Sequence, residues 1–197
     1  LYFLGIGSWP GFFVMFLFLF FVSGVGNAST FQMIPAIMRT EMDRLMPAAD
    51  AATRLEQAIE AAAAALARHT LFAERPDSEA AIVLAGDAMV RRLNATYRGK
   101  DAATNVLSFP FQPPPGAGAE AAAYLGDVVL AAETVVREAQ ALGISPMHHL
   151  QHLVVHGLLH LIGFDHLTDA QATEMELLET TLLARLGVAD PYAEPAT

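Results

Sequence analysis

Apolar residues recur at helical spacing in the Ala-rich segment 51–69, where Leu55, Ile59 and Leu66 would share one face of a helix. Four further helices are expected from local start and stop signals, over residues 87–97, 132–142, 146 to 161 or 162, and from about 169 to before 187. Asp87 is expected to act as an N-cap. Ser145 followed by Pro146 is typical of a helix start, and Gly163 is expected to end that helix.

Short apolar segments next to Gly or Pro predict strands over residues 80–85, 105–111 and 125–131. Residues 31–39 form a fourth β-like segment, which Pro35 would confine to an edge of the sheet or to an irregular strand. Strands and helices alternate without internal repeats. The pattern therefore predicts one α+β domain of the α/β type, with a small mixed four-stranded sheet packed against about five helices.

The first 30 residues differ from the rest of the chain. No charged residue precedes Arg39, and residues 12–22 form an unbroken apolar run. This run is shorter than the about 20 apolar residues that cross a bilayer core. Three interpretations of this hydrophobic extension stay open: a membrane anchor, a signal-like segment without a basic leader, or upstream sequence translated in error, with Met33 as the true start. Membrane association is expected only if the extension belongs to the protein.

Composition narrows the function. A chain of 197 residues with 54% hydrophobic residues can build one packed core. The formal net charge of −10 argues against a protein that coats nucleic acid through its overall field. The absence of cysteine excludes disulfides, thiolate metal sites and cysteine nucleophiles. A metal site in this chain would therefore use His and carboxylate ligands.

The segment HGLLHLIGFDH, residues 156–166, has the spacing of a metal site. His156 and His160 are four residues apart, so their imidazoles would leave one face of a helix. Gly163 would let the chain reverse so that His166 supplies a third nitrogen. Three neutral imidazoles leave zinc a fourth position for water, which is typical of a catalytic rather than a structural site. The chemistry favoured by this arrangement is hydrolysis.

Other polar residues near this segment have weaker assignments. His152 could orient a ligand, face the substrate or lie on the helix surface, and Asp165 could orient an imidazole or support the turn. The spacing coincides with that of metzincin peptidases, H-E-x-x-H-x-x-G-x-x-H. Those enzymes carry a Glu as general base where this chain has Gly157. A peptidase using that mechanism is therefore disfavoured.

Four basic residues fall within ten positions, in contrast to the acidic chain as a whole: Arg91, Arg92, Arg98 and Lys100. Arg98 and Lys100 flank Gly99 at a predicted helix end, where flexible backbone could present both to a phosphate. A solvated helix end, with its cations near the negative end of the helix dipole, is the alternative interpretation.

Five segments in order, LNATYRGKD, TNVLSFPF, LGDVVLA, HGLLHLIGFDH and ADPY, resemble the YbeY family of bacterial metal-dependent endoribonucleases, also called rRNA maturation factors. The likeness covers about residues 45–192. It indicates a YbeY-like domain over residues 31–192, after the extension 1–30 and before a short tail, 193–197. The resemblance also implies one zinc ion per chain, held by His156, His160 and His166, at the end of a central His-rich helix.

The resemblance implies a cytoplasmic enzyme that cuts single-stranded ribosomal RNA, in maturation of the small-subunit 3′ end and in ribosome quality control. Its partners would be this RNA and the ribosome or small subunit. Arg98 and His156 are then expected as catalytic residues, and Arg98 and Lys100 as RNA-binding residues. Two alternatives stay open: a metal-dependent hydrolase of another substrate, and a ribosome-associated factor without catalytic activity.

Overall fold

A computed structural model describes residues 15–20, 51–69, 78–116 and 123–193 of the chain. Its helices are α2 (Ala51–Ala67), α3 (Asp87–Arg98), α5 (Ala132–Leu142), α6 (Pro146–Leu161) and α7 (Asp169–Ala184). Its strands are β1 (Met15–Phe20), β2 (Glu79–Ala85), β3 (Val106–Pro110) and β4 (Tyr124–Ala131). The five helices and the strands β2, β3 and β4 confirm the predicted α+β class with a mixed sheet.

The sheet has the strand order β1-β2-β4-β3. Strands β2 and β4 are parallel, with Ile82 opposite Val128, whereas β3 runs antiparallel to β4, with Leu107 opposite Val129. The parallel pair is joined by a crossover that contains α3 and β3. Strand β3 therefore lies at one edge of the sheet.

The other edge of the sheet is formed by a strand that the sequence pattern does not predict, since the first expected strand begins at residue 31. Residues 31–39, the expected edge strand, lie outside the described residues. The place beside β2 is taken by β1, which pairs antiparallel with it, from Met15 opposite Leu84 to Phe20 opposite Glu79. Pairing with β4 satisfies the backbone groups along one side of β2. The groups along its other side need a second partner, and the apolar, Phe-rich sequence of β1 is well suited to a strand. The division into extension, domain and tail stays a prediction.

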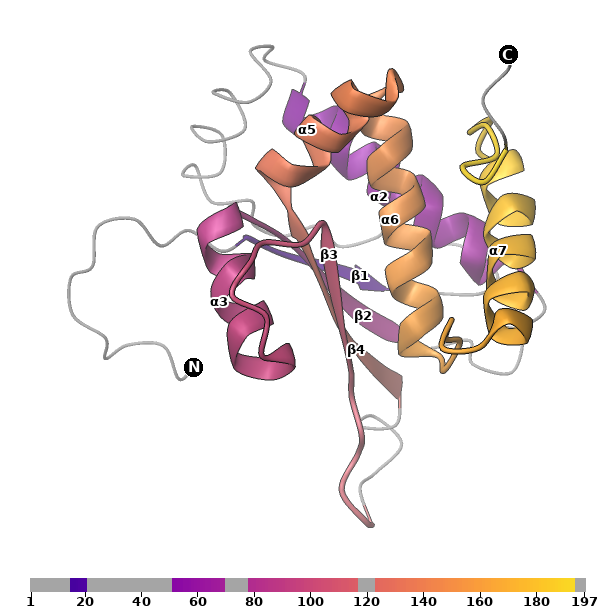
Figure 1. The fold of residues 1–197 in the computed structure, drawn as a ribbon. Helices are drawn as coiled ribbons and strands as arrows, with labels where there is room; N and C mark the ends of the chain where they lie inside the picture. Colours follow the sequence, from indigo (N-terminus) through magenta and orange to yellow (C-terminus); the bar gives the residue numbers. More distant parts are fainter. Residues whose placement is uncertain (1–14, 21–50, 70–77, 117–122, 194–197) are drawn as a thin grey trace.

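Alternate residues of the central strands face different helices. Ile82, Val128 and Leu130 belong to the larger core with α2, α6 and α7. Val83, Val129 and Ala131 belong to a smaller core under α3. Figure 1 shows α2, α6 and α7 on one side of the sheet and α3 on the other. Because successive side chains of a strand point to opposite faces of the sheet, each face packs against its own layer of helices.

The start of α3 corrects one expectation. Asp87 is the first residue of the helix, and Gly86 is the N-cap, so Asp87 does not cap α3. Its carboxylate instead accepts hydrogen bonds from the backbone N–H (3.1 Å) and the hydroxyl (2.8 Å) of Thr134 in α5. Glu133 accepts a bond of 2.8 Å from the Asp87 N–H in return. The ends of the parallel strands β2 and β4 are neighbours, so the two helix starts exchange carboxylates.

Helix α6 follows the sequence closely. The Ser145 side chain accepts a hydrogen bond from the Met147 N–H, and Pro146 is the first helical residue. The predicted core face is buried: Leu150, Leu153, Val154, Gly157, Leu158 and Leu161. Gly163 has a φ of 100°, the left-handed region in which glycine is favoured, and the chain reverses there. None of the helices in the described ranges combines the length and the apolar character that crossing a bilayer requires.

Candidate metal centre

Helix α6 and the loop after it bring three imidazoles together. The Nε2 atoms of His156 and His160 lie 3.1 Å apart. The ring of His166 lies 5.5 Å from that of His156 and 5.1 Å from that of His160, between centroids. One nitrogen of each ring lies within 4.8 Å of the others. The three residues that the spacing singled out therefore converge on one point.

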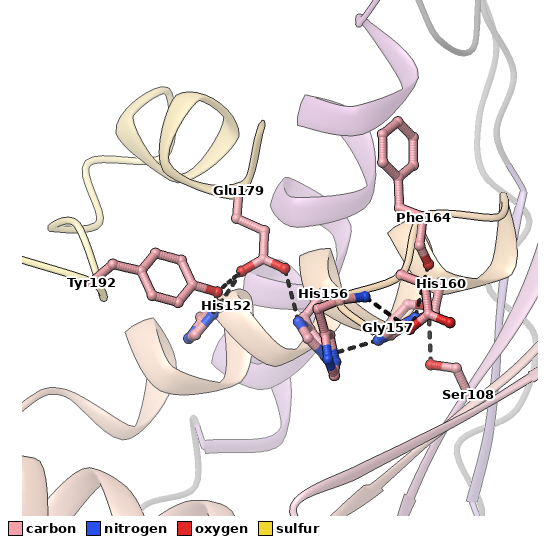
Figure 2. A network of polar contacts seen from close by, with 10 residues as sticks. Ser108, His152, His156, Gly157, His160, Phe164, Glu179 and Tyr192 are labelled. Carbon is pink, nitrogen blue, oxygen red and sulfur yellow. Dashed lines mark hydrogen bonds and ion pairs between the residues drawn. The ribbon is translucent and has the colours of Figure 1, made fainter. Parts of the chain in front are cut away.

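The hydrogen bonds of two rings indicate which nitrogen carries the proton. His156 Nδ1 is 2.8 Å from a carboxylate oxygen of Glu179, and His160 Nδ1 is 2.9 Å from the Phe164 carbonyl oxygen. Both partners are acceptors, so each Nδ1 donates and each neutral ring keeps a lone pair on Nε2. Figure 2 shows these contacts along α6.

Two lone pairs that face each other at 3.1 Å repel each other, and a cation bound between them would remove this repulsion. Two nitrogens bound to a tetrahedral zinc, at about 2.0 to 2.1 Å each, would lie about 3.3 to 3.4 Å apart. Burial, and then the neighbouring imidazoles of His156 and His166, lower the pKa of His160, and this outweighs the opposite effect of Phe164 and Asp165. The neutral ring is thus favoured, and the group can bind a metal ion.

Glu179 is a residue of this site that the sequence analysis missed. It lies in α7 and is fully buried. Its carboxylate contacts His156 Nδ1 at 2.8 Å and His152 Nε2 at 3.1 Å, and it accepts a hydrogen bond from the Tyr192 hydroxyl. Burial by itself would raise the pKa of Glu179, but these hydrogen bonds outweigh it and lower the pKa to about 2. The carboxylate is therefore ionised.

A signal for Glu179 was present in the sequence. The buried residues of α7 are Met175, Glu179, Leu182 and Leu183, which follow one helical stripe. A carboxylate on the apolar stripe of a helix is rarely tolerated without polar partners. The sequence could mark Glu179 as a buried acid, but it could not name partners that lie 23 and 27 residues away.

The weaker candidates have clearer places in the structure. His152 contacts Glu179 and lies one turn from His156, outside the three-imidazole group. Asp165 accepts a hydrogen bond of 2.8 Å from the His166 N–H, and its distance to His160 Nδ1 is 4.0 Å. Asp165 therefore supports the backbone of the turn and does not hydrogen-bond to the His160 imidazole. The acceptor of His160 is the Phe164 carbonyl group.

Gly157 lies where α6 touches the sheet. A Cβ atom built on it would meet a methyl group of Val128 at 2.6 Å and the Ser108 hydroxyl at 3.2 Å. The Ser108 hydroxyl donates to the Gly157 carbonyl group at 3.1 Å. The position next to His156 therefore has no room for a side chain, and it cannot carry the general base found there in metzincins.

Arg98 and Lys100 lie apart from the imidazoles. Both are exposed at the end of α3, where Gly99 has a φ of 68°, on the opposite side of the sheet from α6. Tyr97 packs edge-on against Phe109 of β3, with ring centroids 5.2 Å apart. Ser108, the residue before Phe109 in β3, donates a hydrogen bond to Gly157 of α6. The edge strand β3 therefore lies between the basic residues and the imidazoles.

Fold and site together define a small α+β protein with a group of three histidines that could hold a metal ion. The model of the family "Endoribonuclease YbeY" matches residues 43–187. Endoribonuclease YbeY of Rhodopseudomonas palustris strain BisA53 is 52% identical over 139 residues, which cover 70% of this chain and 78% of that protein. The Azorhizobium caulinodans protein of the same name is 53% identical over 143 residues, covering 72% and 87%. The chain belongs to the endoribonuclease YbeY family, whose name describes enzymes that hydrolyse RNA internally.

A solved structure was also found to be similar. The solution structure of a Thermotoga maritima protein aligns with a TM-score of 0.44 and 20% sequence identity, and the alignment covers 75% of this chain and 96% of that one.

Proposed function

We propose that the chain is a metal-dependent endoribonuclease that cuts single-stranded ribosomal RNA in the cytoplasm, in maturation of the small-subunit 3′ end and in ribosome quality control. The ribosome or its small subunit is the proposed partner. The observation that carries the proposal is the convergence of three imidazoles, two of which have an acceptor at Nδ1 and can therefore offer an Nε2 lone pair to one ion. Family membership supplies the reaction class, hydrolysis of a phosphodiester bond.

His156, His160 and His166 are proposed to hold one zinc ion per chain. Three neutral nitrogens with no carboxylate among them suit zinc better than magnesium or calcium, which prefer oxygen ligands. Such an ion supplies Lewis-acid polarisation of a phosphoryl oxygen and a lowered pKa for water in its open position. Two of these proposed ligands have a defined orientation, because Glu179 fixes the other nitrogen of His156 and the Phe164 carbonyl fixes that of His160.

Arg98 and Lys100 are proposed to bind the RNA. The guanidinium of Arg98 would neutralise charge that develops on the scissile phosphate, and Lys100 would contact a neighbouring phosphate. Because β3 separates these cations from the imidazoles, the substrate would have to cross the edge of the sheet. A single strand can bend over such an edge more readily than a stiff duplex. This arrangement supports the preference for single-stranded RNA.

The test is cleavage of a single-stranded RNA with the sequence of the small-subunit 3′ region by the full chain loaded with zinc. Cleavage should stop when a chelator removes the metal and return when zinc is added back. A duplex of the same sequence should be cut more slowly. Cleavage that persists in chelator would contradict the metal-dependent mechanism.

The role of Arg98 is tested against a matched variant. Arg98→Ala should lower the rate of RNA cleavage by roughly 100-fold, in the range found for groups that stabilise developing charge. Arg185→Ala removes the same charge from an exposed position just after α7 and should leave the rate unchanged. A hydrolase of another substrate would keep its activity in Arg98→Ala. A ribosome-associated factor without catalytic activity would show a lower melting temperature in His160→Ala but no cleavage to lose.

A further inference from the structure

The segment after α7 returns to α6 and closes over Glu179. Asp190 shapes this segment, because its carboxylate accepts hydrogen bonds from the Thr180 hydroxyl (3.2 Å) and from the Tyr192 N–H (2.9 Å). The Tyr192 ring packs edge-on against His152, with centroids 5.8 Å apart. Its hydroxyl donates a hydrogen bond to Glu179. The ADPY motif near the end of the chain therefore reaches the metal centre.

The two oxygens of Glu179 have separate partners. Oε1 accepts from His156 Nδ1, whereas Oε2 contacts His152 Nε2 and accepts from the Tyr192 hydroxyl. A carboxylate anchored through one oxygen cannot rotate without breaking those bonds, so its other oxygen stays aimed at His156. Figure 2 shows this arrangement, with Tyr192 and His152 on one side of the carboxylate and His156 on the other.

The orientation of Glu179 matters for the proposed zinc ligand. A hydrogen bond from Nδ1 to a carboxylate fixes the tautomer of an imidazole, holds the plane of its ring and increases the basicity of Nε2. His156 Nε2 is the atom that faces His160. The surroundings of Glu179 are dry, since the residue is fully buried, and this strengthens the hydrogen bond.

We propose that Glu179 and Tyr192 are positioning residues of the metal centre, through which the C-terminal segment holds His156 in the orientation that binds the ion. The inference rests on the proposed role of His156 as a ligand, but it does not depend on RNA as the substrate. It gives the ADPY motif a function that neither the fold nor the three histidines require.

One other arrangement competes with it. His152, His156 and Glu179 also lie close enough together to hold an ion of their own. Such an ion would need the lone pair of His156 Nδ1, and if the three-histidine group held an ion as well, His156 would have to bridge two metals as a fully deprotonated ring. The Tyr192 hydroxyl also donates to the same carboxylate oxygen that contacts His152. Hydrogen bonding accounts for all these contacts with ordinary protonation states.

The experiment measures metal affinity in the full chain, with zinc in competition with a chromogenic chelator. Tyr192→Phe should raise the Kd for zinc by about tenfold, and Glu179→Gln by about 10- to 100-fold, the range found when a group that orients a ligand is removed. Gln is nearly isosteric with Glu but offers one acceptor oxygen instead of two. Tyr192→Phe keeps the ring and is partly exposed, so folding is preserved.

Tyr124→Phe is the matched control. It also removes a hydroxyl that donates to a carboxylate, that of Asp127 at 2.8 Å, but in β4 and away from the imidazoles. Its Kd for zinc should equal that of the wild type. A second readout is the visible spectrum with Co²⁺ in place of zinc, where Tyr192→Phe and Glu179→Gln should shift the ligand-field bands and Tyr124→Phe should not.

Unchanged Kd and unchanged cobalt bands in both site variants would overturn the inference. Binding of two zinc ions per wild-type chain would overturn it as well, in favour of the competing arrangement. If the two site variants bind zinc more weakly but the wild-type protein cuts no RNA, the inference stands and the proposed substrate is refuted. If the wild-type protein cuts RNA but the two site variants bind zinc as tightly as it does, the proposed substrate stands and the inference is refuted. The two proposals can therefore be tested independently.

Discussion

Each of the three imidazoles is held in a different way. His156 is fixed by the buried Glu179 and His160 by the backbone carbonyl of Phe164, while His166 lies on the exposed loop after α6. The ring of His166 contacts the other two, at 5.1 to 5.5 Å between centroids, and no hydrogen bond of its ring nitrogens is seen among the described residues. Because it is exposed, His166 is the proposed ligand whose loss should affect the fold least.

His166→Ala should separate metal binding from folding. Without metal, its free energy of unfolding should lie within about 0.5 kcal/mol of the wild type, as for other exposed substitutions. Zinc affinity should fall at least about 100-fold because one of three ligands is lost, and RNA cleavage should fall with it. Urea melts in chelator, zinc titration and a cleavage assay measure the three quantities. Full cleavage by this variant would contradict the proposed ligand set.

The Tyr124–Asp127 pair predicts a dependence of stability on alkaline pH. Burial, and then the hydrogen bond to Asp127, raise the pKa of Tyr124 above its usual range near 10. A group whose pKa is raised by folding stabilises the protein fully below its unfolded pKa and loses that contribution as pH rises through its folded pKa. Tyr124→Phe should therefore cost about 1 kcal/mol at pH 8, for the lost hydrogen bond, and progressively less above pH 10.

Urea melts of both proteins between pH 8 and pH 11 check this expectation. The other tyrosines are common to both chains, so their titration cancels in the difference. A difference in stability that grows with pH above 10 would show that the sign of the Tyr124 shift is wrong.

Among the elements, α6 determines where the proposed ligands lie relative to the sheet. It contacts β3 and β4 at Gly157, where the helix backbone lies so close to Val128 that no side chain fits between them. Ala is ordinarily better than Gly inside a helix, by about 1 kcal/mol. Here the added methyl group would meet a valine methyl at 2.6 Å, so the helix would have to move.

Gly157→Ala is accordingly expected to destabilise the protein by about 1 to 3 kcal/mol, in the range of overpacked cores, in spite of its better helix propensity. It should also weaken zinc binding, because His156 moves with the helix. Val128→Ala in the same chain removes the methyl groups that the new one would meet, so the two substitutions together should cost less than the sum of their separate effects. A double-mutant cycle by urea melts should show a coupling energy above about 0.5 kcal/mol. Additive effects would mean that the close contact does not determine the position of α6.

The elements differ in how far the sequence could predict them. Helix α6 was predicted at both ends because Ser145, Pro146 and Gly163 are local signals, and its histidines follow from a spacing of four. The cap of α3 was wrong because the partner of Asp87 lies in α5, 47 residues away. Strand β1 was missed because its pairing with β2 depends on an edge that only the folded sheet creates. Glu179 was missed for the same reason, since its partners come together only in the fold.

At the scale of the whole molecule, charge and architecture point to a local contact with RNA. The chain carries a net charge of −10, while the exposed Arg98 and Lys100 lie at the end of α3. Arg91 of the same helix is already paired with Asp101, through two contacts of 2.6 Å. The proposed phosphate contacts are therefore few, and most of the surface should repel the RNA backbone.

The salt dependence of RNA binding tests this view of the molecule. Each phosphate neutralised on a single strand contributes about −0.7 to the slope of log affinity against log salt concentration. Two cations predict a slope of about −1.4 for the full chain, and Arg98→Ala should reduce it to about −0.7. Binding is measured by fluorescence anisotropy on the metal-free protein, in which the RNA stays intact, between 50 and 300 mM KCl. Arg185→Ala should keep the wild-type slope, because the end of α7 lies outside the proposed contact. A wild-type slope several times steeper would mean that the strand follows a long basic surface, and the two-cation contact across the β3 edge would then be refuted.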